Sequence, residues 1–104
     1  MPIKLDFNKF DFVVINTCYG GFGISKEAAL DIGYLKVDLS NDSLRTNQKL
    51  IKLLLQKGSS YCSDSFSHLE LVKIDKKINW EISEYDGLEE IVVYPKVEHI
   101  EIPQ

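Results

Sequence analysis

The chain opens its regular structure with a short, continuous apolar run, whereas its second half alternates apolar and polar positions. Residues 12–15 read Phe-Val-Val-Ile, and this run of mostly β-branched residues predicts a buried central strand. Residues 69–74 predict another strand, and the alternation at 78–82 predicts a half-buried one. Tyr85-Asp86-Gly87 is typical of a hairpin turn, from which residues 88–94 return as a strand. The second half is therefore predicted to be β-structure.

Helical patterns lie between the first strand and these later strands. Ser25 is a good N-cap for a short helix that Gly33 closes. Thr46 or Asn47 caps an amphipathic helix, and Gly58 stops it. Its apolar face carries Leu50, Ile51, Leu54 and Leu55.

The remaining segments predict connections rather than long elements. Residues 34–45 predict an edge strand or an extended connection, with a turn at 40–43, and the serine-rich segment 59–67 predicts a loop. Residues 97–102 alternate apolar positions and predict a terminal edge strand. The order β-α-α-β-β-β predicts an α+β fold in a single domain over residues 1–104. We expect one mixed β-sheet of about four strands with two helices packed on one face, with a helical crossover that allows parallel pairing.

Size and charge narrow the classes of partner. The chain has 104 residues, with 12 Lys and Arg against 16 Asp and Glu, for a net charge of −4. A nucleic-acid polymer is therefore not expected as the main partner, because such binding needs a basic face. No apolar run approaches a membrane span and the start does not resemble a signal peptide, so we expect a cytoplasmic protein without a membrane partner.

Cysteine and histidine spacing predicts no metal site. Cys18 and Cys62 are expected to be reduced thiols, and with His68 and His99 they show no zinc-binding spacing. No cofactor is expected. The acidic residues of segment 81–90 are explained by a solvated hairpin whose charge discourages edge pairing.

The main candidate site is the glycine-rich segment after the first strand. Glycine amides at a strand-to-helix turn can converge on an anion, although the segment matches neither a Walker loop nor a dinucleotide fingerprint. The leading hypothesis is a binding site for a nucleotide-like or phosphorylated small ligand. The amides of Gly20, Gly21 and Gly23 would hold the anion, and Arg45, the sole arginine beside eleven lysines, would pair with it. The full candidate set is Asn16, Cys18, Tyr19, Gly20, Gly21, Phe22, Gly23, Ser25, Arg45, Glu84, Tyr85 and Asp86, in which Tyr19, Phe22 or Tyr85 would stack on a base or sugar.

Two alternatives from other functional classes stay open. Cys18 lies at a strand end before a helix, where a thiol can become a nucleophile, and His68 is a candidate base that the sequence does not place nearby. Taken alone, the glycines are explained better by a tight strand-to-helix turn without a ligand. A protein-interaction module would use the Tyr-Gly-Gly-Phe-Gly loop and an exposed sheet edge to contact a host protein or a second copy.

The glycine-rich segment also supports a resemblance. Residues 14–25, VINTCYGGFGIS, are similar to the opening motif of a group of small proteins from bacteriophages and other viruses. In that group an arginine precedes the second helix and a W-x-I-x-E-Y-D-G-x-E hairpin follows, matched here by Arg45 and by residues 80–89. The group has no established activity. The resemblance implies a viral protein in the host cytoplasm, with sequestration of a host-defence signal as a role by analogy.

Assembly is the last expectation from the sequence. A chain of this size has a limited core, and the alternating residues at 97–102 are suited to pairing between chains. We expect a homodimer or a higher homo-oligomer, with folding of this tail onto its own sheet as the alternative.

Overall fold

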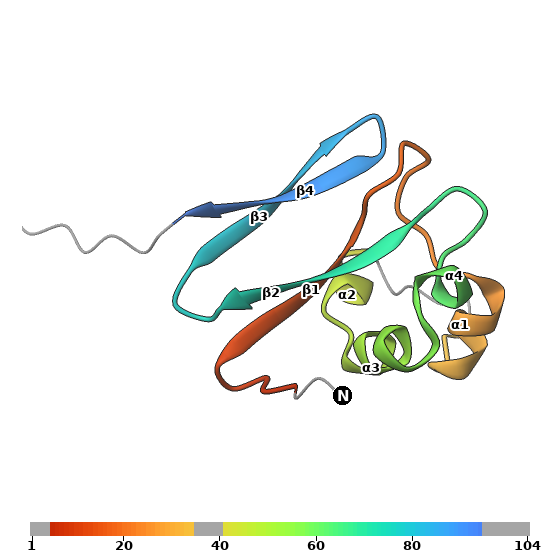
Figure 1. Ribbon diagram of the computed structural model, residues 1–104, viewed down its shortest axis with the longest axis horizontal. Coiled ribbons are helices and arrows are strands. Elements are labelled where there is room, and N and C mark those ends of the chain that lie inside the picture. Colours follow the sequence, from red (N-terminus) through yellow and green to blue (C-terminus); the bar gives the residue numbers. More distant parts are fainter. Residues whose placement is uncertain (1–4, 35–40, 95–104) are drawn as a thin grey trace, which may run out of the picture.

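The computed structural model describes residues 5–34 and 41–94 and contains four strands and four helices. In chain order these are β1 (Phe10–Asn16), α1 (Lys26–Asp31), α2 (Asn41–Arg45), α3 (Gln48–Lys57), α4 (Ser59–Cys62), β2 (Leu69–Asp75), β3 (Asn79–Tyr85) and β4 (Leu88–Tyr94). The helices lie together between the first strand and the other three along the chain (Figure 1). This arrangement confirms the predicted α+β class.

The strands form two antiparallel pairs, so the expectation of one mixed sheet was wrong. β1 pairs with β2, with Phe10 opposite Asp75 and Asn16 opposite Leu69. β3 pairs with β4 around the two-residue turn Asp86-Gly87. Both turn residues have positive φ, 50° and 89°, which is the conformation of the hairpin turn predicted from Tyr85-Asp86-Gly87.

β2 runs antiparallel to β1 because the chain leaves the helices close to the end of β1. The amide of Ser25 donates to the carbonyl oxygen of Cys62 at 2.7 Å, and Ile24 bridges to Ser63. These contacts dock the end of α4 on the segment that follows β1. The chain therefore enters β2 beside the end of β1, and a parallel crossover is avoided.

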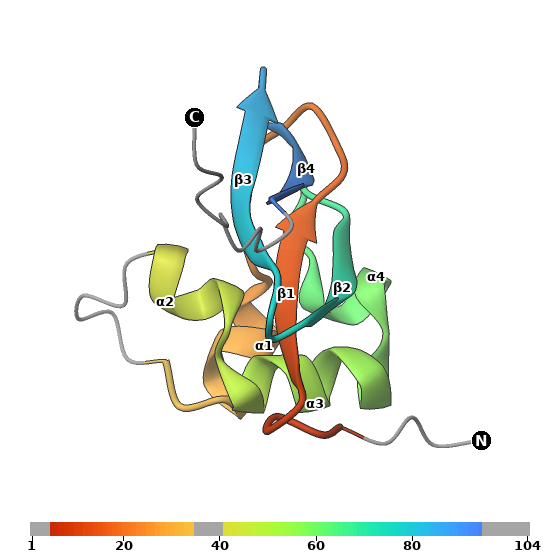
Figure 2. The ribbon, with the colours of Figure 1, turned by 90° about the vertical axis from the view of Figure 1, so that its left-hand side faces the viewer.

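β1 is buried on both faces, which explains its continuous apolar run. Phe12 and Val14 belong to a cluster that the four helices complete. Val13 and Ile15 belong to a second cluster with residues of the β3–β4 hairpin, Trp80 among them. The layers are thus helices, the β1–β2 pair and the β3–β4 hairpin, with four short helices on one face where two were expected (Figures 1 and 2).

The helix caps agree with the sequence. The Ser25 hydroxyl accepts from the amide of Ala28 at 3.0 Å, and the Asn47 side chain accepts from the amide of Leu50 at 3.0 Å. Gly58 ends α3 with φ 90°. The four buried residues of α3 are Leu50, Ile51, Leu53 and Leu54, so Leu53 takes the place predicted for Leu55, which is exposed.

Two short helices replace predicted connections. Residues 41–45 form α2 instead of a turn and extended chain, because Leu44 packs into the helical cluster. Residues 59–62 form α4 within the predicted loop, and Cys62 is buried there. Residues 35–40 and the predicted tail strand at 97–102 lie outside the described residues. Among the described residues, no helix combines the length and the apolar character needed to cross a membrane.

Candidate functional site

The side chain of Asn16, the last residue of β1, connects three loops. It is fully buried, with 0 % of its surface exposed. Its Oδ1 accepts from the amides of Cys18 at 3.2 Å and His68 at 2.9 Å, and its Nδ2 donates to the carbonyl oxygens of Cys18 at 2.6 Å and Gly87 at 2.7 Å. These four bonds use the full donor and acceptor capacity of the amide. Asn16 therefore holds the segments 17–24 and 63–68 and the β3–β4 turn at one end of the molecule.

A buried ion pair fixes the backbone of Asn16. Oε1 of Glu89, in β4, accepts from the backbone amide of Asn16 at 2.8 Å. Both carboxylate oxygens of Glu89 accept from the two terminal nitrogens of Arg45, and both side chains are buried. Such a two-point pair is the strong, directional form of this interaction. The charge of Arg45 is therefore already balanced inside the protein.

The rest of the Arg45 guanidinium is also enclosed. Its carbon lies 3.8 Å from the ring centroid of Phe22, and one terminal nitrogen donates to the Val14 carbonyl oxygen at 3.4 Å. α2 supplies Arg45, so this short helix fixes the position of the ion pair. Phe22 covers the ion pair with its ring and does not present a free face to a ligand on that side.

The glycines of the loop are needed for close packing. A Cβ on Gly20 would lie 1.8 Å from the carbonyl oxygen of Phe66. A Cβ on Gly87 would lie 2.4 Å from the amide nitrogen of Gly21, so the hairpin turn rests directly on the loop. This packing explains the glycines without a ligand, and it places the glycine loop against both the segment 63–68 and the β3–β4 turn.

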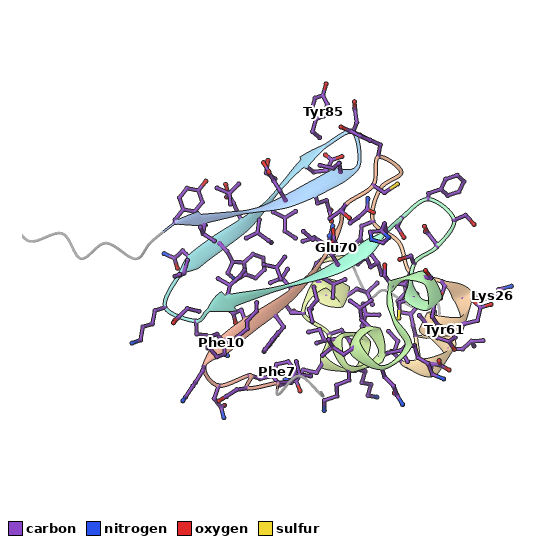
Figure 3. All side chains as sticks on the ribbon, viewed as in Figure 1. Phe7, Phe10, Lys26, Tyr61, Glu70 and Tyr85 are labelled. Carbon is purple, nitrogen blue, oxygen red and sulfur yellow. The ribbon has the colours of Figure 1, made fainter. Side chains whose placement is uncertain are left out.

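Each of these three loops carries or adjoins one aromatic ring that faces solvent, Tyr85 being the last residue of β3. The exposed fractions are 67 % for Tyr19, 69 % for Phe66 and 73 % for Tyr85. In Figure 3 the labelled Tyr85 points away from the body of the molecule at the end of the hairpin. We call the end of the molecule that carries Tyr19, Phe66 and Tyr85 the loop end.

Carboxylates also belong to the loop end. Asp64 lies against Gly23, where a Cβ would meet its Oδ2 at 1.9 Å. Glu84 accepts from the amide of Gly87 at 2.6 Å, and Asp86 is exposed at the tip of the turn. An anion placed on the glycine loop would meet these negative charges, whereas a cation would be attracted.

The two cysteines have different surroundings. Cys18 is exposed in the loop, and Cys62 is fully buried in α4. Burial, together with the nearby charge of Asp31, raises the pKa of the Cys62 thiol. The backbones of Cys18 and His68 meet at Asn16 Oδ1, a proximity that the sequence did not reveal, while the His68 ring nitrogen Nδ1 lies 3.4 Å from the Ser59 hydroxyl.

The structure thus divides the predicted site residues into two groups. The loop end brings together Cys18, Tyr19, Gly20, Gly21, Gly23 and the turn residues 84–86. The interior beneath it contains Asn16, Phe22, Ser25 and Arg45. Ser25 caps α1, and its hydroxyl also donates to the Tyr61 carbonyl oxygen at 2.6 Å.

Sequence reasoning missed Glu89 and Phe66 as parts of this region. Glu89 shares a strand face with Ile91, which packs on β1, so the period-2 pattern of β4 could have placed Glu89 inward next to the lone arginine. Phe66 lies in a serine-rich loop, where no periodicity marks it.

Comparisons of the chain with protein-family models, with curated proteins and with solved structures found no match. The resemblance to the viral group therefore stays a prediction. Within residues 5–34 and 41–94, no group of three or more His, Cys, Asp or Glu side chains is placed to hold a metal ion.

Proposed function

We propose that this protein is a protein-interaction module that binds its partner through the loop end. The observation that carries the proposal is that one buried asparagine is hydrogen-bonded to three segments distant in sequence, each of which bears an exposed aromatic ring. Tyr19, Phe66 and Tyr85 are the rings, and Asn16 bonds to a backbone group within or beside each loop.

Exposed aromatic rings on a fixed base suit protein recognition. Leaving large apolar surface in water is unfavourable, and contiguous apolar patches mark interaction sites. Tyrosine is enriched among the residues that dominate binding energies, because it offers a large contact area with few rotatable bonds. The buried pair of Arg45 and Glu89 fixes the base, so little ordering remains to be done on binding.

The charges at the loop end indicate the chemistry of the partner. Asp64, Glu84 and Asp86 belong to the same segments as the rings. A partner surface that presents lysine or arginine beside apolar groups would complement both features, because a cation is attracted by carboxylates and by an aromatic face. If the chain belongs to the viral group that it resembles, a host protein would be such a partner.

The same charges weigh against the nucleotide-like ligand as the main function. Arg45 is already paired with Glu89, and carboxylates border the loop whose amides would hold a phosphate. Sequestration of an anionic host signal therefore ranks behind protein binding. The cysteine-dependent alternative is favoured by one observation, the meeting of the Cys18 and His68 backbones at Asn16.

Selection from a displayed peptide library tests the proposal. We expect the wild-type protein to enrich peptides that combine Lys or Arg with apolar residues. The variant Tyr19→Ser/Phe66→Ser/Tyr85→Ser should lose this enrichment. The matched control, Leu30→Ser/Leu55→Ser/Val93→Ser, removes three other exposed apolar side chains and should keep it.

Two results would overturn the proposal. One is equal enrichment by the wild type and the loop-end variant. The other is a thermal shift by a nucleotide or cyclic nucleotide that the Arg45→Ala variant abolishes, which would favour the small-ligand hypothesis.

A further inference from the structure

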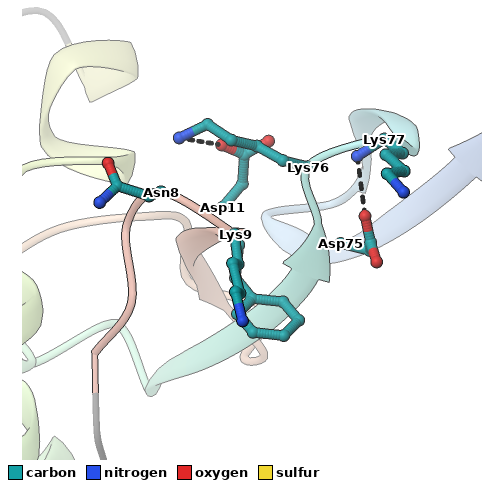
Figure 4. A pocket seen from close by; sticks show the side chains of 7 residues that line it. Asn8, Lys9, Asp11, Asp75, Lys76 and Lys77 are labelled. Atoms are coloured by element: carbon teal, nitrogen blue, oxygen red, sulfur yellow. Dashed lines mark hydrogen bonds and ion pairs between the residues drawn. The ribbon is translucent and has the colours of Figure 1, made fainter.

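A cavity lined by lysines lies at the end of the molecule away from the loop end. It has a volume of about 730 Å3 and lies between the turn before β1 and the turn between β2 and β3 (Figure 4). Its lining consists of Asn8, Lys9, Phe10, Asp11, Asp75, Lys76 and Lys77. We call this cavity the lysine pocket.

The carboxylates of the lysine pocket have donors, whereas two of its ammonium groups have no partner among the described residues. Asp11 accepts from the Trp80 indole at 3.2 Å and lies 3.9 Å from the Lys76 ammonium. Asp75 accepts from the amide of Lys77 at 2.9 Å. No hydrogen bond or ion pair within residues 5–34 and 41–94 involves the ammonium groups of Lys9 and Lys77. The pocket therefore has positive charge to offer.

The two ends of β3 carry opposite chemistry. Lys76 and Lys77 precede the strand, whereas Tyr85 is its last paired residue and Asp86 follows it. A strand of seven residues separates the two ends by about 20 Å. In Figure 3, Phe10 of the pocket and Tyr85 lie at opposite ends of the molecule. The hairpin tip of one chain therefore cannot enter its own lysine pocket.

We propose that the β3–β4 tip of one copy docks into the lysine pocket of a second copy, so that the chain associates head to tail. This inference rests on the proposed function and names the partner of part of the loop end. The Tyr85 ring would enter the pocket beside Phe10, and the carboxylate of Asp86 would pair with Lys9 and Lys77. Charge complementarity and the protruding ring, 73 % exposed, carry the assignment.

Head-to-tail contact has consequences for the assembly. Each copy keeps one unused tip and one unused pocket, so association continues into open chains or closes into a ring. A tip inserted into one pocket buries less than the ~1,200 Å2 typical of stable complexes, so the contact should be weak. Because its attraction is largely electrostatic, it should weaken as salt is added.

Sedimentation velocity of the full chain tests the proposal. At low salt the wild type should shift to larger species between about 10 μM and 1 mM, the range expected of a small interface. The tip variant Tyr85→Ala/Asp86→Asn and the pocket variant Lys9→Glu/Lys77→Glu should each stay monomeric. Their equimolar mixture should form a species of two chains and no larger, because only one intact tip and one intact pocket remain. The control Lys49→Glu/Lys52→Glu, which changes two exposed lysines of α3, should associate like the wild type.

Other outcomes separate this inference from the proposed function. A wild type that stays monomeric over the whole range, or a mixture that forms no dimer, overturns docking between copies. If peptide enrichment still depends on the loop-end residues in that case, the protein remains an interaction module, and its partner is not a second copy of the chain. If the library shows no such dependence, both proposals fail.

Discussion

The side-chain nitrogen of Asn16 donates to the carbonyl oxygen of Gly87 at 2.7 Å, across 71 residues of sequence. This bond joins the end of the most deeply buried strand to the tip of the outermost hairpin. The other bonds of the same amide reach Cys18 and His68. One buried polar side chain thus sets the arrangement of the three loops that carry the exposed rings.

Replacing Asn16 should therefore be costly. Asn16→Leu keeps an apolar side chain of similar size but leaves four backbone groups without their partner. Each buried polar group left unpaired costs about 1–3 kcal/mol, so we expect a loss of at least 3 kcal/mol in the free energy of unfolding, measured with urea. Asn79→Leu, at an exposed position of β3, should change it by less than about 0.5 kcal/mol. Similar losses for the two variants would contradict the anchoring role of Asn16.

The ion pair of Arg45 and Glu89 should show strong coupling in a double-mutant cycle. Either Arg45→Met or Glu89→Gln alone disrupts a buried charge pair, and breaking such a pair by removing one partner costs about 3–5 kcal/mol. The double variant leaves no uncompensated charge and keeps an acceptor for the Asn16 amide. It should be more stable than the sum of the two single losses predicts. Additive losses in urea unfolding would show that the two side chains do not act as a pair.

Thiol labelling distinguishes the interaction module from the cysteine-dependent alternative. Burial raises the pKa of Cys62, so its thiolate is scarce and shielded, and we expect alkylation of native protein at Cys18 alone. If Cys18 is an ordinary exposed thiol, its alkylation rate should match that of a free small-molecule thiol and should be unchanged in the His68→Ala variant. A faster rate that His68→Ala abolishes would favour catalysis. Mass spectrometry of labelled peptides measures both sites.

Tyr61 should make stability depend on alkaline pH. Its hydroxyl donates to Asp31 at 2.5 Å. This bond is the main cause, and partial burial the second, of a rise in the pKa of Tyr61 from 10.0 to about 12. In the folded state the phenol keeps its proton at a pH where the unfolded chain loses it. The stabilisation is complete below pH 10 and is lost as the pH rises from 10 through 12. Asp31→Asn should lower this pKa in an ultraviolet titration read against Tyr61→Phe; an unchanged titration would refute the link.

Local sequence patterns correctly predicted the features that depend only on residues nearby in the sequence. The caps at Ser25 and Asn47, the stop at Gly58 and the Asp86-Gly87 turn all depend on neighbouring backbone groups, and the structure places them as expected. The run at 12–15 also correctly indicated a strand buried on both faces. What covers each face, however, comes from segments far along the chain, so the number of layers could not be predicted.

The candidate region shows the same limit. The glycine loop and the Glu84–Asp86 turn were singled out by their residue types, and they do meet. The role of Arg45 depends on its distance to Glu89, 44 residues away, and no local pattern encodes that pairing. The exposure of Phe66 likewise depends on its backbone packing against Gly20. The residue types were informative, while their long-range partners decided what they do.

The account depends most on the claim that the three loops are held as one body, and amide hydrogen exchange tests this claim directly. The backbone amide of Asn16 donates to the Glu89 carboxylate, and the backbone amides of Cys18 and His68 donate to the Asn16 side chain. All three acceptors are side-chain oxygens, which take no part in the backbone hydrogen bonds of a helix or sheet. We predict that these three amides exchange as slowly as those in the centre of β1, and that Asn16→Leu accelerates Cys18 and His68 together. Fast exchange of Cys18 and His68 in the wild type, or acceleration of one without the other, would contradict a loop end built on Asn16.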